Sequence, residues 1–199
     1  MHANLRLPLI LLAFFIALGL SSGVCAQAAH GAHEHGVAEL AVVLEGPELV
    51  VELSSPLDNL VGFEHAPAND VQRAALVEAG RRLRDAGAMF VLPAAAGCRL
   101  GDTDIESPWP LGTAATASRP TPAPASAHAG HTHAPPVGGD HGDVVATWRF
   151  TCAQPQALER LEVGAFRQFP RLRKLRVEHV TARGQGAAVL TPRAFAFAL

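Results

Sequence analysis

The sequence has little of several features that mark whole classes of proteins. Its 199 residues include only three cysteines and two methionines, and its 16 Lys+Arg are outnumbered by 18 Asp+Glu. Without a basic excess the chain does not resemble a nucleic-acid-binding protein, which gathers lysine and arginine against phosphates. It also contains no His-Glu-x-x-His helix, no Gly-x-Ser-x-Gly elbow and no glycine-rich phosphate loop. These absences argue against nucleic-acid binding, and we do not expect an enzyme.

Long apolar runs are also missing, apart from one at the N-terminus. Arg6 precedes the run Leu7–Leu20, and the small residues of Val24-Cys25-Ala26 follow it. A charged start, a short apolar middle and a small-residue exit predict a cleavable signal peptide over residues 1–26. The run is shorter than the roughly 20 residues of a membrane span, which disfavours an N-terminal anchor. A lipoprotein is disfavoured because valine precedes Cys25. We therefore expect a periplasmic protein consisting of one domain, residues 27–199, with no membrane span after cleavage.

Export determines how the remaining cysteines are interpreted. Once Cys25 is removed, Cys98 and Cys152 form an even pair in an oxidising compartment, which predicts a disulfide. Neither cysteine lies in a Cys-x-x-Cys or Cys-x-x-His arrangement, so zinc thiolates are less favoured. In the chain-entropy model such a bond is worth about 4 kcal/mol. We expect it to hold together the two ends of the unusual segment that lies between the cysteines.

That segment, residues 107–142, holds seven of the fifteen prolines of the chain. Proline fixes φ and supplies no amide donor, so neither helix nor sheet can continue through it. We predict a disordered Pro/His-rich insertion, because a stretch of this length without secondary structure is normally disordered or functional.

The flanking sequence shows the periods of strands and one helix. We predict a hairpin from Gly36–Glu45 and Glu48–Leu53, a helix from Asn69 or Asp70 to about Ala86, and a short helical turn over Ala157–Glu162. Further strands are predicted at Met89–Leu92, Cys98–Leu100, Val144–Cys152, Leu172–Ala182 and Ala187–Thr191. The fold class is therefore α+β and β-rich, with antiparallel, sandwich-like sheets, one or two short helices and a long disordered His/Pro-rich loop between two strands.

Histidines are concentrated at the start of the predicted mature chain, at His30, His33 and His35. In an extended chain alternate side chains share a face, so His33 and His35 point the same way. Neutral imidazole is the commonest metal ligand, and a carboxylate such as Glu34 or Glu64 would help to complete four-coordination. The pattern predicts a metal site. The alternative is a solvated arm with incidental histidines.

A second group of histidines lies in the predicted loop. Histidines on a flexible chain can wrap around an ion, although ordering the chain lowers the affinity. The alternative is a spacer without function. The candidate ligands are His128, His131, His133 and His141, with Asp140 and Asp143 as possible additions. His65 could supply another ligand or cap the next element, whereas His179 alternates with Val177 on a predicted strand and is expected to be structural.

Four motifs carry a resemblance to a known family. They are HGAHEHGVAELAVVLEG from His30, SPLDNLVGFEHAP from Ser55, FRQFPRLRKLRV from Phe166 and GQGAAVL from Gly184. With the central His/Pro loop, they resemble the ZrgA family of periplasmic zinc-regulated proteins of Gram-negative bacteria. The resemblance implies zinc binding through histidines and a role in zinc acquisition beside a zinc ABC importer.

The sequence thus leads to the expectation of a periplasmic zinc-binding protein that buffers zinc or delivers it to the binding protein of a zinc ABC importer. Two alternatives remain open: an interaction module ordered by metal, and a chaperone for nickel or copper. The scarcity of methionine weighs against copper(I), which favours thioether ligands.

Overall fold

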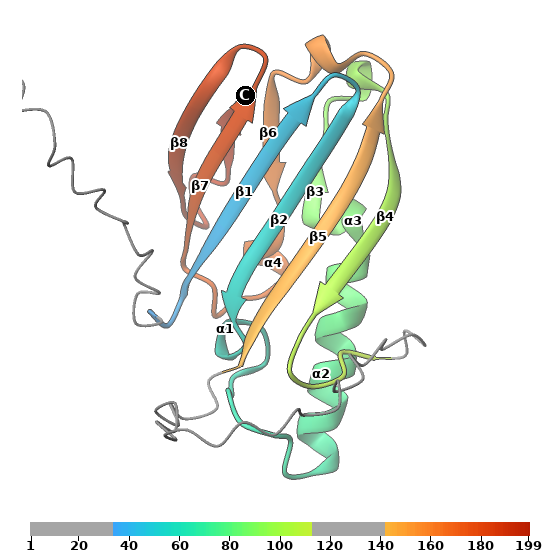
Figure 1. Cartoon of the computed structure of the whole chain (residues 1–199). Coiled ribbons are helices and arrows are strands. Elements are labelled where there is room, and N and C mark those ends of the chain that lie inside the picture. Colours follow the sequence, from blue (N-terminus) through green and yellow to red (C-terminus); the bar gives the residue numbers. More distant parts are fainter. Residues whose placement is uncertain (1–33, 113–141) are drawn as a thin grey trace, which may run out of the picture. The chain divides into compact units, whose positions relative to one another are not determined.

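A six-stranded sheet is the centre of the computed structural model, which describes residues 34–112 and 142–199 (Figure 1). The strand order is β4-β5-β2-β1-β7-β8, and neighbours are antiparallel except β1 and β7, which are parallel. The strands are β1 (Val37–Glu45), β2 (Glu48–Pro56), β4 (Cys98–Glu106), β5 (Asp143–Cys152), β7 (Lys174–Thr181) and β8 (Gly184–Leu190).

Alternation along the strands gives this sheet one buried and one open face. In β1, Leu40, Val42 and Leu44 are buried, whereas Ala41 and Val43 between them are exposed. The same alternation continues in β2 and β5, because a period of two places successive side chains on opposite faces. The β1–β2 hairpin is confirmed, and Gly46 at φ 54° provides its turn.

A second layer covers the buried face. It consists of the small antiparallel sheet β3 (Phe90–Val91), β6 (Arg160–Val163) and β9 (Ala196–Ala198), together with the helices (Figure 1). Trp148 of β5 is completely buried, and its indole N–H donates to the carbonyl of Leu83 at 2.8 Å. Phe90 meets the Trp148 ring edge-on with centroids 4.8 Å apart. The core between the layers is therefore built around an indole that has a hydrogen-bond partner.

The longest helix of the described residues is α2 (Asp70–Arg84), as the sequence predicted. The Asn69 side chain caps it by accepting from the Gln72 amide at 3.0 Å, and Leu76, Ala79 and Leu83 form its buried face. The remaining helical segments are single turns: α1 (Asp58–Val61), α3 (Ala86–Met89), α4 (Ala165–Gln168), η1 (Ala94–Ala96) and η2 (Pro155–Ala157).

The predicted fold class is confirmed, and three details differ. Ala157–Glu162 is not helical: η2 ends at Ala157, and Arg160–Val163 pairs as β6 between β3 and β9. The strand predicted over Ala187–Thr191 begins earlier, at Gly184, and ends at Leu190 as β8. The parallel pairing of β1 with β7 joins residues that are far apart in the sequence, so no local sequence pattern predicts it.

The Cys98–Cys152 disulfide is confirmed, but its expected effect on the loop was wrong. Cys98 begins β4 and faces Cys152 at the end of β5. Glu106 and Val145 pair at the other end of this two-stranded hairpin. β4 ends at Glu106 and β5 begins at Asp143, so the strand ends that flank residues 113–141 in the chain lie at the opposite end of this hairpin from the bond. Packing of Gly142 against Trp109 holds the chain together at the loop instead.

The described residues from Glu34 to Leu199 form one compact unit. The predicted signal peptide lies outside the described residues and remains a prediction. Within the described part of the chain, no helix has the length and apolar character needed to cross a bilayer.

Candidate metal centre

The start of β1 and the short helix α1 meet at one end of the large sheet (Figure 1). Two backbone features of Gly36 fix the chain just before β1. Gly36 has φ +82°, a conformation that favours glycine, and its carbonyl accepts from the amides of Arg173 at 2.7 Å and Lys174 at 2.9 Å. The chain that carries His35 is therefore fixed to the beginning of β7.

Asn59 of α1 fixes the same chain from the other side. This buried side chain accepts from the Gly36 amide at 2.6 Å and donates to the Val37 carbonyl at 2.8 Å. Its amide also donates to Ser55 Oγ at 3.1 Å. A buried polar group is costly unless it is paired, and here three hydrogen bonds satisfy it. Asn59 thus ties the segment before β1 to the end of β2.

His35 is the metal candidate that the structure positions most clearly. Its Nδ1 lies 3.2 Å from Oδ2 of Asp58, and its side chain is 68% exposed. The carboxylate is less open, with 21% of the Asp58 side chain exposed. An ionised carboxylate only accepts hydrogen bonds, so a neutral His35 ring bonded to Asp58 would carry its proton on Nδ1 and keep the Nε2 lone pair available. An imidazole in this state can bind a metal ion.

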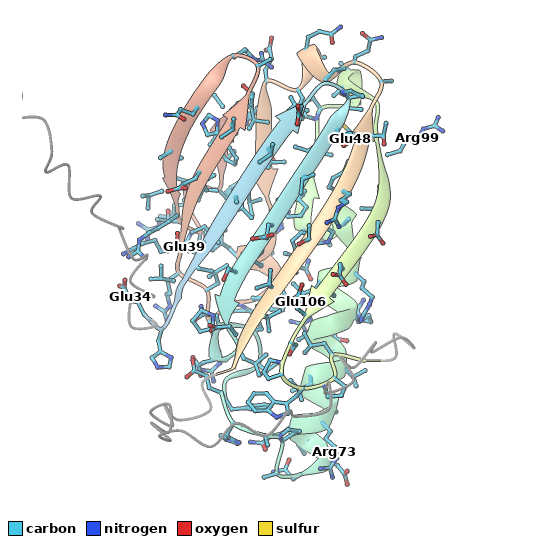
Figure 2. All side chains as sticks on the ribbon, in the orientation of Figure 1. Glu34, Glu39, Glu48, Arg73, Arg99 and Glu106 are labelled. Atoms are coloured by element: carbon cyan, nitrogen blue, oxygen red, sulfur yellow. A yellow bond between two sulfur atoms is a disulfide. The ribbon has the colours of Figure 1, made fainter. Side chains whose placement is uncertain are left out.

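Glu34, the neighbouring candidate, makes different contacts. Its carboxylate lies 2.9 Å from Arg176 Nη2 and 3.8 Å from Lys174 Nζ (Figure 2 labels Glu34 beside the start of β1). Hydrogen bonds to Glu39 and then Glu34 raise the pKa of Arg176. Glu34 therefore balances the cations of β7, and this role competes with metal ligation.

Two arginines border the His35–Asp58 pair. Arg171 and Arg173 line a recess of about 400 Å³ together with His35, Gly36 and Asp58. Arg171 Nη1 lies 3.9 Å from Oδ1 of Asp58, the carboxylate oxygen that His35 does not use. The cations lower the local attraction for a metal ion, and the carboxylate offsets part of their charge.

The other described candidates lie apart from this pair. His65 Nδ1 bonds the Ala66 carbonyl at 2.8 Å, and its ring packs at a tilt against Phe63 with centroids 5.2 Å apart. Glu64 precedes it in the same segment, and Asp143 opens β5 opposite Pro56. Within residues 34–112 and 142–199, no three His, Cys, Asp or Glu side chains gather closely enough to hold a metal. The candidates His30, His33, His128, His131, His133, Asp140 and His141 lie outside the described residues.

His179 is half-buried on β7. Its ring lies 5.6 Å from that of Phe197, and a Cβ on Gly186 would be only 2.5 Å from its Nε2. Gly186 of β8 thus makes room for the imidazole, which also contacts Phe197 of β9, in keeping with the structural role expected for His179.

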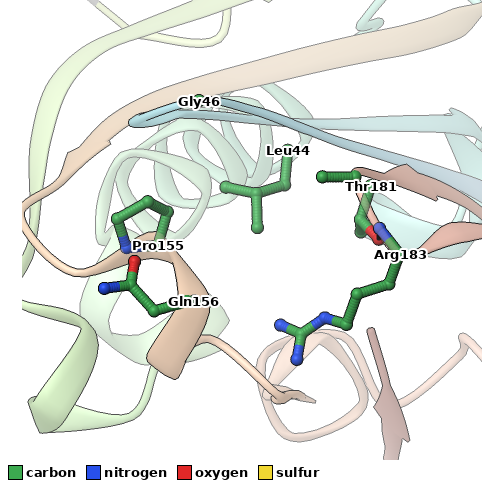
Figure 3. A pocket seen from close by; sticks show the side chains of 7 residues that line it. Leu44, Gly46, Pro155, Gln156, Thr181 and Arg183 are labelled. Atoms are coloured by element: carbon green, nitrogen blue, oxygen red, sulfur yellow. Dashed lines mark hydrogen bonds between the residues drawn. The ribbon is translucent and has the colours of Figure 1, made fainter.

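A second recess, of about 330 Å³, lies near the β1–β2 turn (Figure 3). Leu44 and Pro155 give it an apolar lining, while Figure 3 shows Arg183 and Gln156 extending along its rim. No histidine, cysteine or carboxylate lines it. It therefore offers none of the side chains that zinc prefers.

Asp58 and Asn59 were not among the site residues predicted from the sequence. Both lie in the motif SPLDNLVGFEHAP, where an acid and an amide stand before an apolar run. The pattern alone could not show that α1 folds back against the residues before β1.

Together, the fold and this end of the sheet define a β-rich protein that presents a histidine-bearing segment beside a carboxylate. The family model described as ZrgA family zinc uptake protein matches residues 32–199. The chain therefore belongs to the ZrgA family, as the resemblance predicted, and has a role in zinc uptake. A comparison with curated proteins finds no match.

Proposed function

We propose that this chain is a periplasmic zinc-binding protein that buffers zinc or delivers it to the binding protein of a zinc ABC importer. Membership of the zinc uptake family carries the proposal, because it supplies the metal and the process. Zinc is then the cargo of the protein, and no catalytic step is required of it.

The proposed ligands come from two parts of the chain. His30 and His33 precede His35, whose exposed ring is held at the end of the sheet. The loop supplies His128, His131, His133 and His141, with Asp140 and Asp143 as possible additions. Glu34, Glu64 and His65 are further possible ligands.

The described ends of these two parts meet at α1. The Leu57 amide donates to the Gly142 carbonyl at 2.8 Å, and the next residue, Asp58, contacts His35. Gly142, the first described residue after residues 113–141, therefore bonds the neighbour in sequence of Asp58, which contacts His35. This arrangement supports a function in which both groups of histidines serve one process.

Exposure of His35 suits transfer of zinc rather than its permanent storage. A zinc ion bound by exposed imidazoles can exchange its ligands one at a time with an acceptor protein. A closed site of four buried ligands holds zinc structurally and leaves no position open for exchange. The proposed partner is accordingly a protein whose own zinc site is more complete than this one.

Calorimetric titration of the mature chain with zinc, nickel and copper tests the proposal. We expect zinc to bind, and His33→Ala with His35→Ala to weaken the tightest event while the fold remains intact. The matched control is Glu45→Ala with Glu48→Ala, which removes two carboxylates at the opposite end of the β1–β2 hairpin. Identical curves for the histidine double variant and the parent would contradict the assignment. Stronger binding of nickel or copper would favour the alternative chaperone function.

Acidification provides an independent measurement. Imidazole must be neutral to coordinate a metal, so lowering the pH towards about 5 should release the zinc. Retention of zinc at that pH would indicate ligands other than histidine.

A further inference from the structure

We propose that Asp58 is a positioning residue for His35: it accepts the Nδ1 proton and so assigns Nε2 as the atom that binds zinc. This inference rests on the proposed function and identifies one ligand atom and its support. Its first basis is the hydrogen bond of 3.2 Å between Nδ1 and Oδ2.

The second basis is the rigidity of the chain on both sides of that bond. Asn59 follows Asp58 directly and bonds Gly36, which follows His35 directly. The Gly36 carbonyl is held in turn by the amides that begin β7. The imidazole and the carboxylate are therefore carried by two segments clamped together one residue away, which lowers the entropy lost when the pair forms.

The third basis is the chemistry of metal-bound histidine. Such a ring almost always donates its second N–H to a carboxylate, carbonyl or water, which fixes its tautomer and orientation and raises its basicity. Loss of such a partner typically weakens metal binding about 10–100-fold. Asp58 supplies this partner, while most of the His35 side chain stays open to solvent.

The two arginines of the recess make the carboxylate more important. Asp58 is the one carboxylate among the residues that line this recess. Without it, the lining would hold Arg171 and Arg173 beside His35 with no negative charge to offset them. Asp58 contacts both sides at once, with Oδ2 towards His35 and Oδ1 towards Arg171 at 3.9 Å. It therefore orients the ring and reduces the local repulsion of a zinc ion.

The test combines a tautomer measurement with zinc titration on the mature chain labelled with ¹⁵N-histidine. Long-range ¹H–¹⁵N spectra of the metal-free protein at about pH 8, where imidazole is neutral, report which nitrogen carries the proton. The signals of His35 are assigned by their loss in His35→Gln. We expect Nδ1–H in the parent, loss of that preference in Asp58→Ala, and zinc binding about 10–100-fold weaker in that variant.

Three further variants keep the result interpretable. Asp58→Asn preserves the shape of the side chain if Asp58→Ala does not fold, and we expect a mixture of tautomers because an amide can accept or donate. Asp58→Glu should restore part of the zinc affinity. Asp102→Ala changes the net charge equally but lies on β4, paired with Arg149, and should leave His35 unaffected.

Each failure has a different signature. An Nε2–H tautomer in the parent, or zinc affinity that falls in His35→Gln but not in Asp58→Ala, overturns the role of Asp58 and leaves the proposed function standing. A parent chain that binds no zinc overturns the proposed function and this inference with it.

Discussion

The carbonyl oxygen of Leu111 occupies the space where a side chain on Gly80 would begin, since a Cβ there would lie 1.9 Å away from it. Arg84 Nη1 donates to the same oxygen at 2.8 Å, and Leu111 itself is buried. The chain is thereby fixed on α2 immediately before it leaves the described residues at Gly112.

Gly80→Ala should displace this contact. Adding a methyl group to a closely packed site typically costs about 1–3 kcal/mol, and no flexible side chain can yield here because the obstacle is backbone. Urea unfolding of the metal-free protein measures the loss. Gly87→Ala is the matched control, because the nearest atom to its Cβ would be Asp85 Oδ1 at 3.7 Å. Equal stability of the two variants would show that the Leu111 contact is not important for folding.

Removing the disulfide should destabilise the scaffold without affecting the candidate metal centre. The cysteines are separated by 54 residues, so Cys98→Ala with Cys152→Ala should lower the free energy of unfolding by up to about 4 kcal/mol. The affinity for zinc at the N-terminal site should stay unchanged, because the bond lies at the end of the β4–β5 hairpin away from α1. Alkylation and mass spectrometry of the parent provide the control. Two freely alkylated thiols would rule out the bond, and thiols protected only by added zinc would indicate a mixed Cys/His site.

Replacing residues 113–139 with a short Gly/Ser linker should reduce the number of zinc ions bound. Three of the four loop histidines are lost, whereas the contacts of Trp109, Leu111 and Gly142 are kept. The thermal midpoint of the metal-free protein should change little, because the entropy of loop closure varies slowly with length. A linker with the same length as the original segment and no histidines separates composition from length. Loss of cooperative unfolding would show that the segment belongs to the core.

Glu78 should make the stability of α2 sensitive to acid. Hydrogen bonds from Arg81 and then Arg82 lower its pKa from 4.5 to about 2. A depressed pKa contributes stability above the unfolded value, and this contribution is lost as the pH falls towards 2. The stability difference between the parent and Glu78→Gln should therefore shrink below about pH 4.5. Carboxyl NMR titration measures the pKa directly, and Arg81→Ala should raise it. A Glu78 that titrates normally in the parent would contradict the prediction.

Local patterns in the sequence predicted most of the individual elements. The alternation in Val37–Glu45 and Val144–Cys152, and the cap at Asn69, depend on residues close together in the chain. The parallel pairing of β1 with β7 and the short strand Ala196–Ala198 depend on distant partners, and only the assembled sheets reveal them.

The candidate site was predictable only in part, for a related reason. Ligand chemistry pointed to His35 because imidazole binds metals wherever it is exposed. Asp58 acquires its role only when α1 folds against the chain before β1, and Glu34 faces cations that lie more than a hundred residues later in the sequence. Residue type thus identifies a ligand, while its supporting partners follow from tertiary structure.

The parallel contact between β1 and β7 also determines when the sheet can be completed. Glu39 and Arg176 are 137 residues apart, so β1 keeps one open edge until nearly the whole chain is available. Contacts of such long range slow folding, because the chain must lose its loop entropy before the contact is gained. The His35–Asp58 pair spans only 23 residues and can form once the β1–β2 hairpin and α1 are in place. The pair can therefore meet early, whereas the bonds from Arg173 and Lys174 that hold the Gly36 carbonyl form only when the sheet closes.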